Sequence, residues 1–258
     1  ILAQAHQQGD PLVALEYFEK ALPHCKASEN KPLEAEALNE MGIIHKRLGN
    51  VIKAEEYYKK VLIVVADLDD LIAKATFESG SHNNLGELYY EQGRFQEAFD
   101  RFKKAYEIGK SVKIAAATAR PLNNLANCYL SFGDIKKAIE LYTEALLIHQ
   151  KSGDQDAKNS EVAVLNNLGA ANFYLNNIAE AKSFYQQSIA KNTFDILTKA
   201  KSLKNLGCLY ANTKDYSKAL DCLQQALEIF QNNVKAEEGH NLLLIGQVYK
   251  NRPKNNSK

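Results

Sequence analysis

The sequence lacks the features that mark several large classes of protein. Its longest uninterrupted apolar run, residues 61–66, is far shorter than the roughly 18 residues that a membrane-spanning helix needs. The 32 lysines and arginines balance 31 aspartates and glutamates, whereas nucleic-acid-binding domains usually carry a clear basic excess. No charged-then-apolar signal peptide opens the chain. These absences argue against membrane insertion and against a nucleic-acid partner.

The sequence also lacks the motifs of metal and nucleotide chemistry. Cys25, Cys128, Cys208 and Cys222 form no CxxC pair, so we expect small buried side chains rather than disulfides or metal ligands. The six histidines show no metal-ligand spacing, and GxxxxGK, GxGxxG and GxSxG are missing. We therefore predict no enzymatic activity, no metal and no cofactor. Reduced thiols and the missing signal peptide favour the cytoplasm.

What the sequence does contain is a repeated phrase. NNLG at 83–86 returns as NNLA at 123–126, NNLG at 166–169 and KNLG at 204–207. The small residue that ends the phrase, here called the marker, recurs every 38–44 residues. The markers are Gly42, Gly86, Ala126, Gly169, Gly207 and Gly246. Self-similarity at such a period is typical of proteins built from stacked repeats.

Each repeat is predicted to form two helices. Leu122, Leu125, Ala126 and Tyr129 have the spacing of one helical face. The residues seven after the markers are Gly49, Gly93, Gly133, Asn176 and Lys214, and the residues that follow them are Asn50, Arg94, Asp134, Asn177 and Asp215. Glycine and asparagine readily adopt the left-handed conformation that ends a helix. The Asn and Asp residues that follow should start the second helix by accepting backbone N–H bonds.

The second helix has its own columns. Alanine stands 12 residues after the first five markers, and the residues 16 after them are Tyr58, Phe102, Tyr142, Tyr185 and Leu223. We expect the alanine to meet the marker and the ring to fill the gap to the next repeat. Three residues after the marker, His45 and Asn172 replace the usual tyrosine, and we expect His45 to be buried and hydrogen-bonded. One helix pair cannot bury both of its faces, so the repeats should stack.

This order of small residue, tyrosine, glycine, alanine, aromatic and alanine resembles the tetratricopeptide repeat. The resemblance covers nearly the whole chain and implies an all-α fold, a right-handed α-solenoid of stacked helix-turn-helix repeats. The usual repeat has 34 residues. The longer period with Asn-Leu-Gly is similar to kinesin light chain and to the spindle-orientation adaptors of the Leu-Gly-Asn type. The extra residues at 67–81 and 151–160 should lengthen helices or insert turns.

We therefore expect a single solenoid over residues 1–250, followed by a polar tail at 251–258. The chain begins with Ile1 rather than Met and opens partway through a repeat, so we expect a fragment of a longer protein. The predicted parts are a partial repeat at 1–24, full repeats at 33–66, 77–110, 117–150, 160–191 and 198–231, and a final first helix at 238–250.

The asparagine two residues before the marker carries the functional prediction. This column contains Asn84, Asn124, Asn167 and Asn205 in four consecutive repeats. Helical geometry points it away from the core face, and in the resembling family that face lines a concave groove for peptides. Asparagine offers both a donor and an acceptor, so a ladder of them can pair with a peptide backbone of any sequence.

Two basic residues flank this ladder. Arg120 and Lys201, six residues before their markers, would add charge-assisted bonds to an acidic side chain or a terminal carboxylate of the partner. Together with Asn124, Asn167 and Asn205 they resemble the carboxylate clamp of chaperone-binding members. The match is incomplete, because Arg120 stands where the clamp has lysine and Asn205 where it has arginine.

The leading hypothesis is a non-catalytic adaptor that binds a peptide segment of another protein. One alternative is a structural subunit of a large assembly, which would use its convex face and the segments 67–81 and 151–160. The asparagines could also simply cap helices or bond locally. An RNA reader would need near-constant repeat spacing and a basic face, and the sequence has neither.

Overall fold

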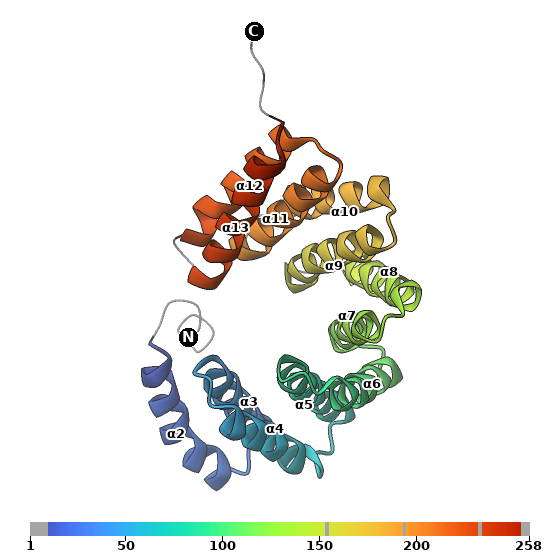
Figure 1. The fold of residues 1–258 in the computed structure, drawn as a ribbon. Coiled ribbons are helices and arrows are strands. Elements are labelled where there is room, and N and C mark those ends of the chain that lie inside the picture. Colours follow the sequence, from blue (N-terminus) through green and yellow to red (C-terminus); the bar gives the residue numbers. More distant parts are fainter. Residues whose placement is uncertain (1–9, 153–154, 193–194, 232–233, 254–258) are drawn as a thin grey trace. The chain divides into compact units, whose positions relative to one another are not determined.

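The computed structural model describes residues 10–152, 155–192, 195–231 and 234–253, and within these ranges all regular structure is helical (Figure 1). The chain divides into two compact parts, the N-terminal half Ile1–Phe132 and the C-terminal half Gly133–Lys258. Each half is described by itself. The all-α prediction is confirmed, whereas a single solenoid over residues 1–250 stays a prediction. Residues 1–9 of the partial first repeat and residues 254–258 of the tail lie outside the described ranges.

The described helices alternate with short turns in both halves. The N-terminal half contains α2 Pro11–Ala27, α3 Lys31–Arg47, α4 Val51–Val65, α5 Leu71–Glu91, α6 Phe95–Ser111 and α7 Ala115–Ser131. The C-terminal half contains α8 Ile135–Ser152, α9 Gln155–Tyr174, α10 Ile178–Lys191, α11 Ile196–Asn212, α12 Tyr216–Gln231 and α13 Lys235–Asn251. Because α5 starts at Leu71 and α9 at Gln155, the extra residues lengthen first helices, as expected.

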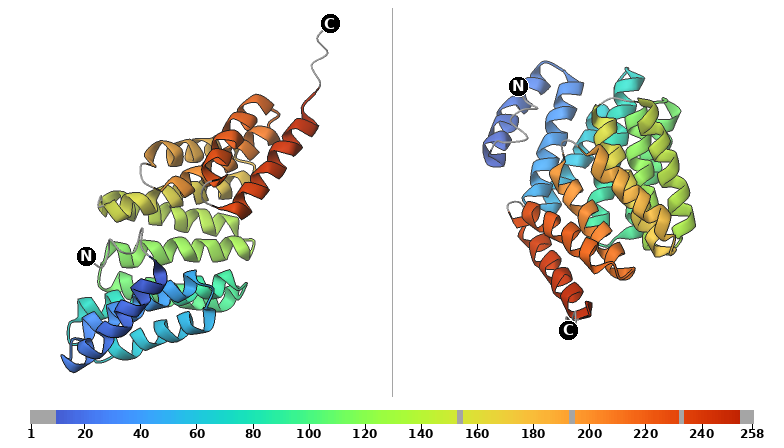
Figure 2. Two further views of the ribbon diagram at one scale, coloured as in Figure 1. Left: turned by 90° about the vertical axis from the view of Figure 1, so that its left-hand side faces the viewer. Right: turned by 90° about the horizontal axis from the view of Figure 1, so that it is seen from above.

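Within each half, consecutive helices pack side by side and run in alternating directions (Figures 1 and 2). First helices also contact one another: α5 touches both α3 and α7, and α11 touches both α9 and α13. Second helices such as α4, α6 and α12 pack on the other side of this row. A side chain on the free side of a first helix can therefore reach its counterpart in the next repeat.

The turns between the paired helices confirm the predicted stop signals. Gly49 and Gly93 have φ of 75°, and the non-glycine residues in the same column, Asn176 and Lys214, have φ of 61° and 62°. Left-handed backbone is costly for a lysine, so its presence at 214 shows that packing of the helix pair imposes the turn.

The start of the second helix differs in part from the prediction. Asp134 and Asp215 accept the backbone N–H of the residue three further on, at 3.1 and 3.3 Å. For Asn50 and Asn177 the prediction is wrong, because neither side chain makes a cap bond.

These two asparagines instead bond to the residues that replace tyrosine three positions after the marker. Nδ2 of Asn50 lies 3.4 Å from Nδ1 of His45, and Asn177 donates to Oδ1 of Asn172 at 3.2 Å. His45 is buried and stacks on Tyr57, with ring centroids 5.3 Å apart, so the prediction of a buried, hydrogen-bonded histidine is confirmed. A polar side chain in this column obtains its partner from the turn that follows it.

The structure adds a contact to the role predicted for the second-helix aromatic. A Cβ atom added to Gly42 would lie 2.6 Å from the ring of Tyr58, and one added to Gly86 would lie 2.6 Å from Phe102. The ring of each second helix thus rests on the marker glycine of its own repeat. This ring requires a small marker, since a side chain there would overlap the ring. In the fifth repeat a Cβ atom added to Gly207 would also lie 3.2 Å from the carbonyl oxygen of Ala219, so there the recurrent alanine meets the marker as predicted.

A further tight crossing involves Gly109 on α6, and substituting it tests the packing. A Cβ there would overlap the backbone carbonyl of Ala117 on α7. We expect Gly109→Ala to lower the free energy of unfolding by about 1–3 kcal/mol, as overpacked sites do, as measured by urea denaturation. Gly80 on α5 has nothing within 4 Å of an added Cβ, so the control Gly80→Ala should stabilise by up to about 1 kcal/mol. A Gly109→Ala variant as stable as the parent would contradict this crossing.

In the described ranges, no helix combines the length and the apolar character that crossing a membrane requires.

Candidate functional site

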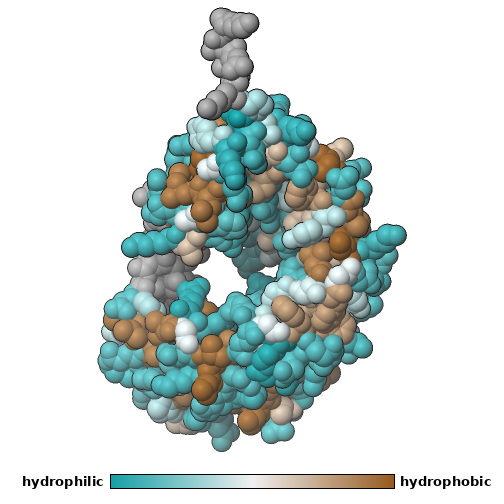
Figure 3. Space-filling view, in the orientation of Figure 1, coloured by the Kyte–Doolittle hydropathy of each residue, from teal (hydrophilic) through white to brown (hydrophobic). Residues whose placement is uncertain are grey.

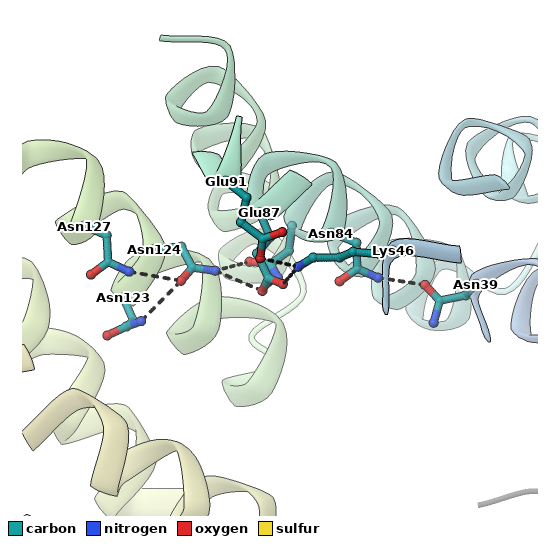
Figure 4. Close-up of polar contacts among 9 residues, drawn as sticks. Asn39, Lys46, Asn84, Glu87, Glu91, Asn123, Asn124 and Asn127 are labelled. Atoms are coloured by element: carbon teal, nitrogen blue, oxygen red, sulfur yellow. Dashed lines mark hydrogen bonds and ion pairs between the residues drawn. The ribbon is translucent and has the colours of Figure 1, made fainter. Parts of the chain in front are cut away.

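The second asparagine of the repeated phrase joins neighbouring first helices in the N-terminal half. The side-chain amide of Asn84 on α5 donates to Oδ1 of Asn39 on α3 at 2.8 Å. The amide of Asn124 on α7 donates in the same way to Oδ1 of Asn83 on α5 at 2.9 Å. Figure 4 shows these side chains on successive helices, with the bond from Asn84 reaching across to Asn39. The acceptor is always the residue three before the marker of the preceding repeat.

The same arrangement occurs in the C-terminal half. The amide of Asn205 on α11 donates to Oδ1 of Asn166 on α9 at 3.0 Å, and the Ser202 hydroxyl donates to the same oxygen at 3.1 Å. Asn167 stands beside Asn166 on α9 and is half-buried. The functional prediction includes only the second asparagine of each doublet. The first asparagine is the acceptor at Asn83 and Asn166, and the doublet NN at 83–84, 123–124 and 166–167 is the sequence signal for it.

Part of the predicted ladder keeps an accessible acceptor. Asn84 and Asn205 are half-buried, and Oδ1 of each receives no hydrogen bond from any residue that the structure describes. Oδ1 of Asn124 accepts long bonds from Asn123 and Asn127, at 3.3 and 3.5 Å. Asn84, Asn124 and Asn205 therefore connect repeats through the side-chain amide nitrogen. At Asn84 and Asn205 the side-chain carbonyl oxygen remains available to another molecule.

A charged group that the sequence did not single out adjoins the ladder. The carboxylate of Glu87 accepts from Lys46 at 3.2 Å, from Asn83 at 2.9 Å and from Asn124 at 3.4 Å. Lys46 also pairs with Glu91 at 2.9 Å (Figure 4). Burial opposes the charge of Lys46, but the carboxylates of Glu87 and Glu91 outweigh it and raise the lysine pKa. No repeating residue type marks these columns, so periodicity could not reveal them.

The two predicted basic residues are exposed, in different halves of the chain. Arg120 lies on α7, and Lys201 on α11. Neither forms an ion pair with any residue in the described ranges. Lys204 pairs with Glu237 at 2.7 Å, and this bond holds the pKa of Glu237 below its usual value, with Lys201 and His240 adding to the effect. The clamp built from both halves stays a prediction.

The described residues contain no grouping of three His, Cys, Asp or Glu side chains that could hold a metal ion. All four cysteines are free thiols, and three of them are buried, as expected for small apolar side chains. Burial raises the pKa of Cys128 to about 12, and burial with nearby aspartates raises that of Cys222 to about 11. Thiols with such pKa values stay protonated at neutral pH and make poor nucleophiles.

Comparison with protein families decides the relationship. A model of the tetratricopeptide repeat matches residues 2–62, 78–151 and 117–192, and a second such model matches residues 200–233. The chain belongs to the tetratricopeptide-repeat family. Tetratricopeptide repeats generally mediate protein–protein interactions, and members of the family are typically not enzymes.

Individual relatives agree with this assignment. A TPR repeat-containing protein of Methanocaldococcus jannaschii is 25% identical over 213 residues, which are 80% of this chain and 34% of that protein. The chain thus spans about a third of the length of this curated relative. The similarity to kinesin light chain and to Leu-Gly-Asn-type adaptors stays a prediction.

Two solved structures share the fold. The crystal structure of BtubC from P. vanneervenii matches with a TM-score of 0.67 and 21% identity, over 90% of each chain. Aspartyl phosphate phosphatase F from Bacillus subtilis matches with a TM-score of 0.65 and 14% identity, over 93% of this chain and 66% of that one. At these identities the likeness concerns the tetratricopeptide fold alone.

The bond between tetratricopeptide repeats at Asn84 can be measured by a double-mutant cycle. We expect Asn39→Ala and Asn84→Ala each to lower the free energy of unfolding by about 1 kcal/mol, because each leaves a half-buried amide without its partner. The double variant should lose less than the sum, with a coupling energy of about 0.5–1.5 kcal/mol. Urea denaturation of the four proteins gives this value, and strictly additive losses would show that the bond does not join the two helices.

Proposed function

We propose that the chain is a non-catalytic interaction module, an adaptor that binds a peptide segment of another protein along the free side of its first helices. The site consists of Asn84, Asn124, Asn167 and Asn205 with Arg120 and Lys201. The proposal rests on the observation that the two polar groups of the asparagine side chain have different roles. The amide nitrogen holds neighbouring repeats together, while Oδ1 of Asn84 and Asn205 has no donor in the described part of the chain.

A side-chain oxygen without a donor suits an extended backbone. A peptide N–H can donate to such an oxygen whatever its own side chain is. Each bond contributes only about 1 kcal/mol net, so several are needed for measurable affinity. The contacts that fix the asparagines also limit their rotamers before binding, which lowers the entropy cost of ordering them when the partner arrives.

The basic residues favour a partner segment with a negative group. Arg120 is exposed without an ion-pair partner in the described ranges, so it is available for a bidentate bond to a carboxylate. Lys201 lies close enough to Glu237 to lower the pKa of that carboxyl, and this interaction would compete with an incoming acidic group. We therefore expect Arg120 to contribute more than Lys201 to the choice of an acidic side chain or terminal carboxylate. A cytoplasmic location is part of the same proposal.

Affinity capture from an extract of the source cells tests the proposal. The parent chain would be compared with the triple variant Asn124→Ala/Asn167→Ala/Asn205→Ala, after circular dichroism has shown that both are folded. The matched control Gln96→Ala/Gln187→Ala/Gln224→Ala removes three exposed amides from second helices. We expect mass spectrometry to find a partner that the parent and the control retain and the asparagine variant loses. Retention of the same partners by all three proteins would refute the proposal.

One observation favours the alternative of a structural subunit that uses helix edges. Leu71 and Ile72, in the segment 67–81, are 72% and 64% exposed at the start of α5. Figure 3 shows further apolar side chains in separate patches among polar ones. Chemical crosslinks from a captured partner to this segment, with no effect of the asparagine substitutions, would support the alternative.

A further inference from the structure

The C-terminal half contains an open pocket where the repeat pattern is broken. The second-helix residue that rests on the marker is an aromatic in four repeats, with Tyr58, Phe102, Tyr142 and Tyr185 all at most 2% exposed. In the fifth repeat this residue is Leu223, which rests on Gly207. A cavity of about 310 Å³ lies directly against Leu223. It is lined on the other sides by residues of α9, α11 and α13 and by Tyr216 at the start of α12, all within the same half.

The pocket occupies the place of the missing ring. Burial, together with the carboxylates of Glu87, Glu91 and Glu40, raises the pKa of Tyr58, so its phenol lies on the side of the ring that faces these groups and not among apolar side chains alone. Glu87 and Glu91 stand one and five residues after the marker of the following repeat.

The residues at the equivalent positions around Leu223 line the pocket. They are Gln247 and Asn251 on α13, one and five residues after the marker Gly246. The cavity is thus the volume that a tyrosine in this column would fill.

The chemistry of the lining also suits a phenol-like ring. The inner walls are the apolar side chains of Phe173, Leu223, Leu244 and Val248, while amide groups come from Asn212, Gln247 and Asn251. None of the lining residues is charged. A buried tyrosine needs an apolar surround for its ring and a hydrogen-bond partner for its hydroxyl, and this lining supplies both.

The pocket continues the line of the proposed peptide site. Cys208, in its wall, stands three residues after Asn205 on α11, which is the next position along one helical face. Leu244 holds on α13 the position that Asn205 holds on α11, two residues before the marker. The ladder of amides therefore ends, on α13, at an apolar residue of the pocket wall.

We propose that this pocket receives an aromatic side chain of the Tyr or Phe type from the partner segment that lies at Asn205. The inference rests on the proposed function and specifies the partner: its bound segment carries an aromatic anchor. The partner's ring fills in this repeat the space that an aromatic residue of the chain itself fills in the other repeats, at Tyr58, Phe102, Tyr142 and Tyr185. Anchors of this kind usually dominate the binding energy of an interface.

Filling the pocket from within is the first test. Gly207, like Gly42, Gly86 and Gly169, has no side chain that could overlap a ring in this column, so Leu223→Tyr should fold, raise the melting temperature and slow alkylation of Cys208. Cys208 is the only one of the four thiols that is not buried, so it reports on the pocket. The matched control Leu147→Tyr, at a half-exposed position on α8, should leave Cys208 alkylation unchanged. An unfolded Leu223→Tyr chain, or one with unchanged Cys208 reactivity, would overturn the assignment of the cavity to a ring.

The second test asks whether an external ring enters. N-acetyltyrosinamide should slow alkylation of Cys208 in the parent but not in Leu223→Tyr, and N-acetylalaninamide should have no effect in either. Random heptapeptides displayed on phage and selected on the parent should share an aromatic residue at one position. They should bind Leu223→Tyr about thirtyfold more weakly, as expected for a strong anchor, and bind Leu147→Tyr normally.

The outcomes separate this inference from the proposed function. Selected peptides that lose binding to Asn205→Ala but bind Leu223→Tyr normally would leave the peptide site intact and overturn the aromatic anchor. If no peptide is selected, the proposed function is the idea that fails, and the result with N-acetyltyrosinamide decides the pocket. Absence of Cys208 protection by N-acetyltyrosinamide would overturn the inference in either case.

Discussion

Replacing Phe102 by alanine is expected to lower the free energy of unfolding by about 3–5 kcal/mol, the usual cost of removing a large buried ring. The ring is 1% exposed and lies against Gly86, which has no side chain that could move into the space. Its neighbours Ala98 and Ala105 on α6 are fully buried and equally small. The cavity would therefore persist, which places the loss in the upper part of this range. Urea denaturation monitored by circular dichroism measures it.

The contact between the Phe102 ring and Gly86 is tested more sharply by the double variant. Gly86→Ala alone should cost about 1–3 kcal/mol, because its methyl group would lie 2.6 Å from the Phe102 ring. In the Phe102→Ala background the same methyl group enters the empty space, so its cost should vanish or become a gain. Contacting residues that couple in this way give non-additive losses. If the two losses simply add, the ring does not define the size of the marker.

Acidification from pH 7 to pH 4 is expected to remove about 3 kcal/mol of stability through His82. This side chain is 3% exposed on α5, and burial, with Lys104 and Arg101 nearby, lowers its pKa from 6.5 to about 4. The pKa of His82 is lower in the folded chain than in the unfolded chain. At pH values between the two, the unfolded chain therefore binds a proton that the folded chain does not bind. The stabilising contribution is complete above about pH 6.5 and is lost as the pH falls towards 4.

Geometry supports this direction. Nη1 of Arg101 lies 3.3 Å from Nδ1 of His82, so the imidazole nitrogen must accept there. Protonation would remove the acceptor and place a positive charge beside the guanidinium, which disfavours the charged imidazole further.

A leucine substitution isolates the contribution of His82. Leucine occupies the same column, four residues before the marker, at Leu38, Leu122, Leu165 and Leu203. His82→Leu should therefore fold, and its stability should fall by about 3 kcal/mol less than that of the parent between pH 6.5 and pH 4. The control His24→Leu, at an exposed position on α2, should keep the pH dependence of the parent. An unchanged slope in His82→Leu would contradict the assignment.

The fold could be predicted because its rules are local. A left-handed residue seven after the marker ends one helix whichever side chain supplies it, as Gly49 and Lys214 show. Column spacing also identified the buried residues, since Ala98, Phe102 and Ala105 form one face of a helix. The contacts that these side chains make with the first helix were less predictable. Ring and glycine lie 16 residues apart, and only the crossing angle of two helices decides that the ring meets the marker.

The bonding of the candidate site residues could not be predicted. The partner of Asn84 is Asn39, which lies 45 residues away on another helix. Their contact depends on how adjacent repeats stack, which no spacing within one repeat encodes. The same holds for Glu87 and Lys46, which come from columns without a shared residue type. The doublet of asparagines was the one available signal for a bond between repeats.

The pocket illustrates a different limit. Leu223 was visible as the one aliphatic residue in an aromatic column, but a substitution in a sequence does not tell whether neighbours close the space. Here they do not, because the residues of α9, α11 and α13 beside Leu223 leave a cavity of about 310 Å³. A departure from the repeat pattern became informative only with the surrounding helices in place.

The central claim is that the asparagine two residues before the marker joins repeats through its amide group and receives a partner through its carbonyl group. Nuclear magnetic resonance of the isotopically labelled chain tests it without a substitution, by following the side-chain signals of Asn84 and Asn205 as the captured partner segment is added. We predict that the Cγ carbonyl signals shift on binding, while the amide protons bonded to Asn39 and Asn166 remain protected from exchange. A segment that binds without moving either carbonyl signal would contradict the claim and leave these asparagines with a purely structural role.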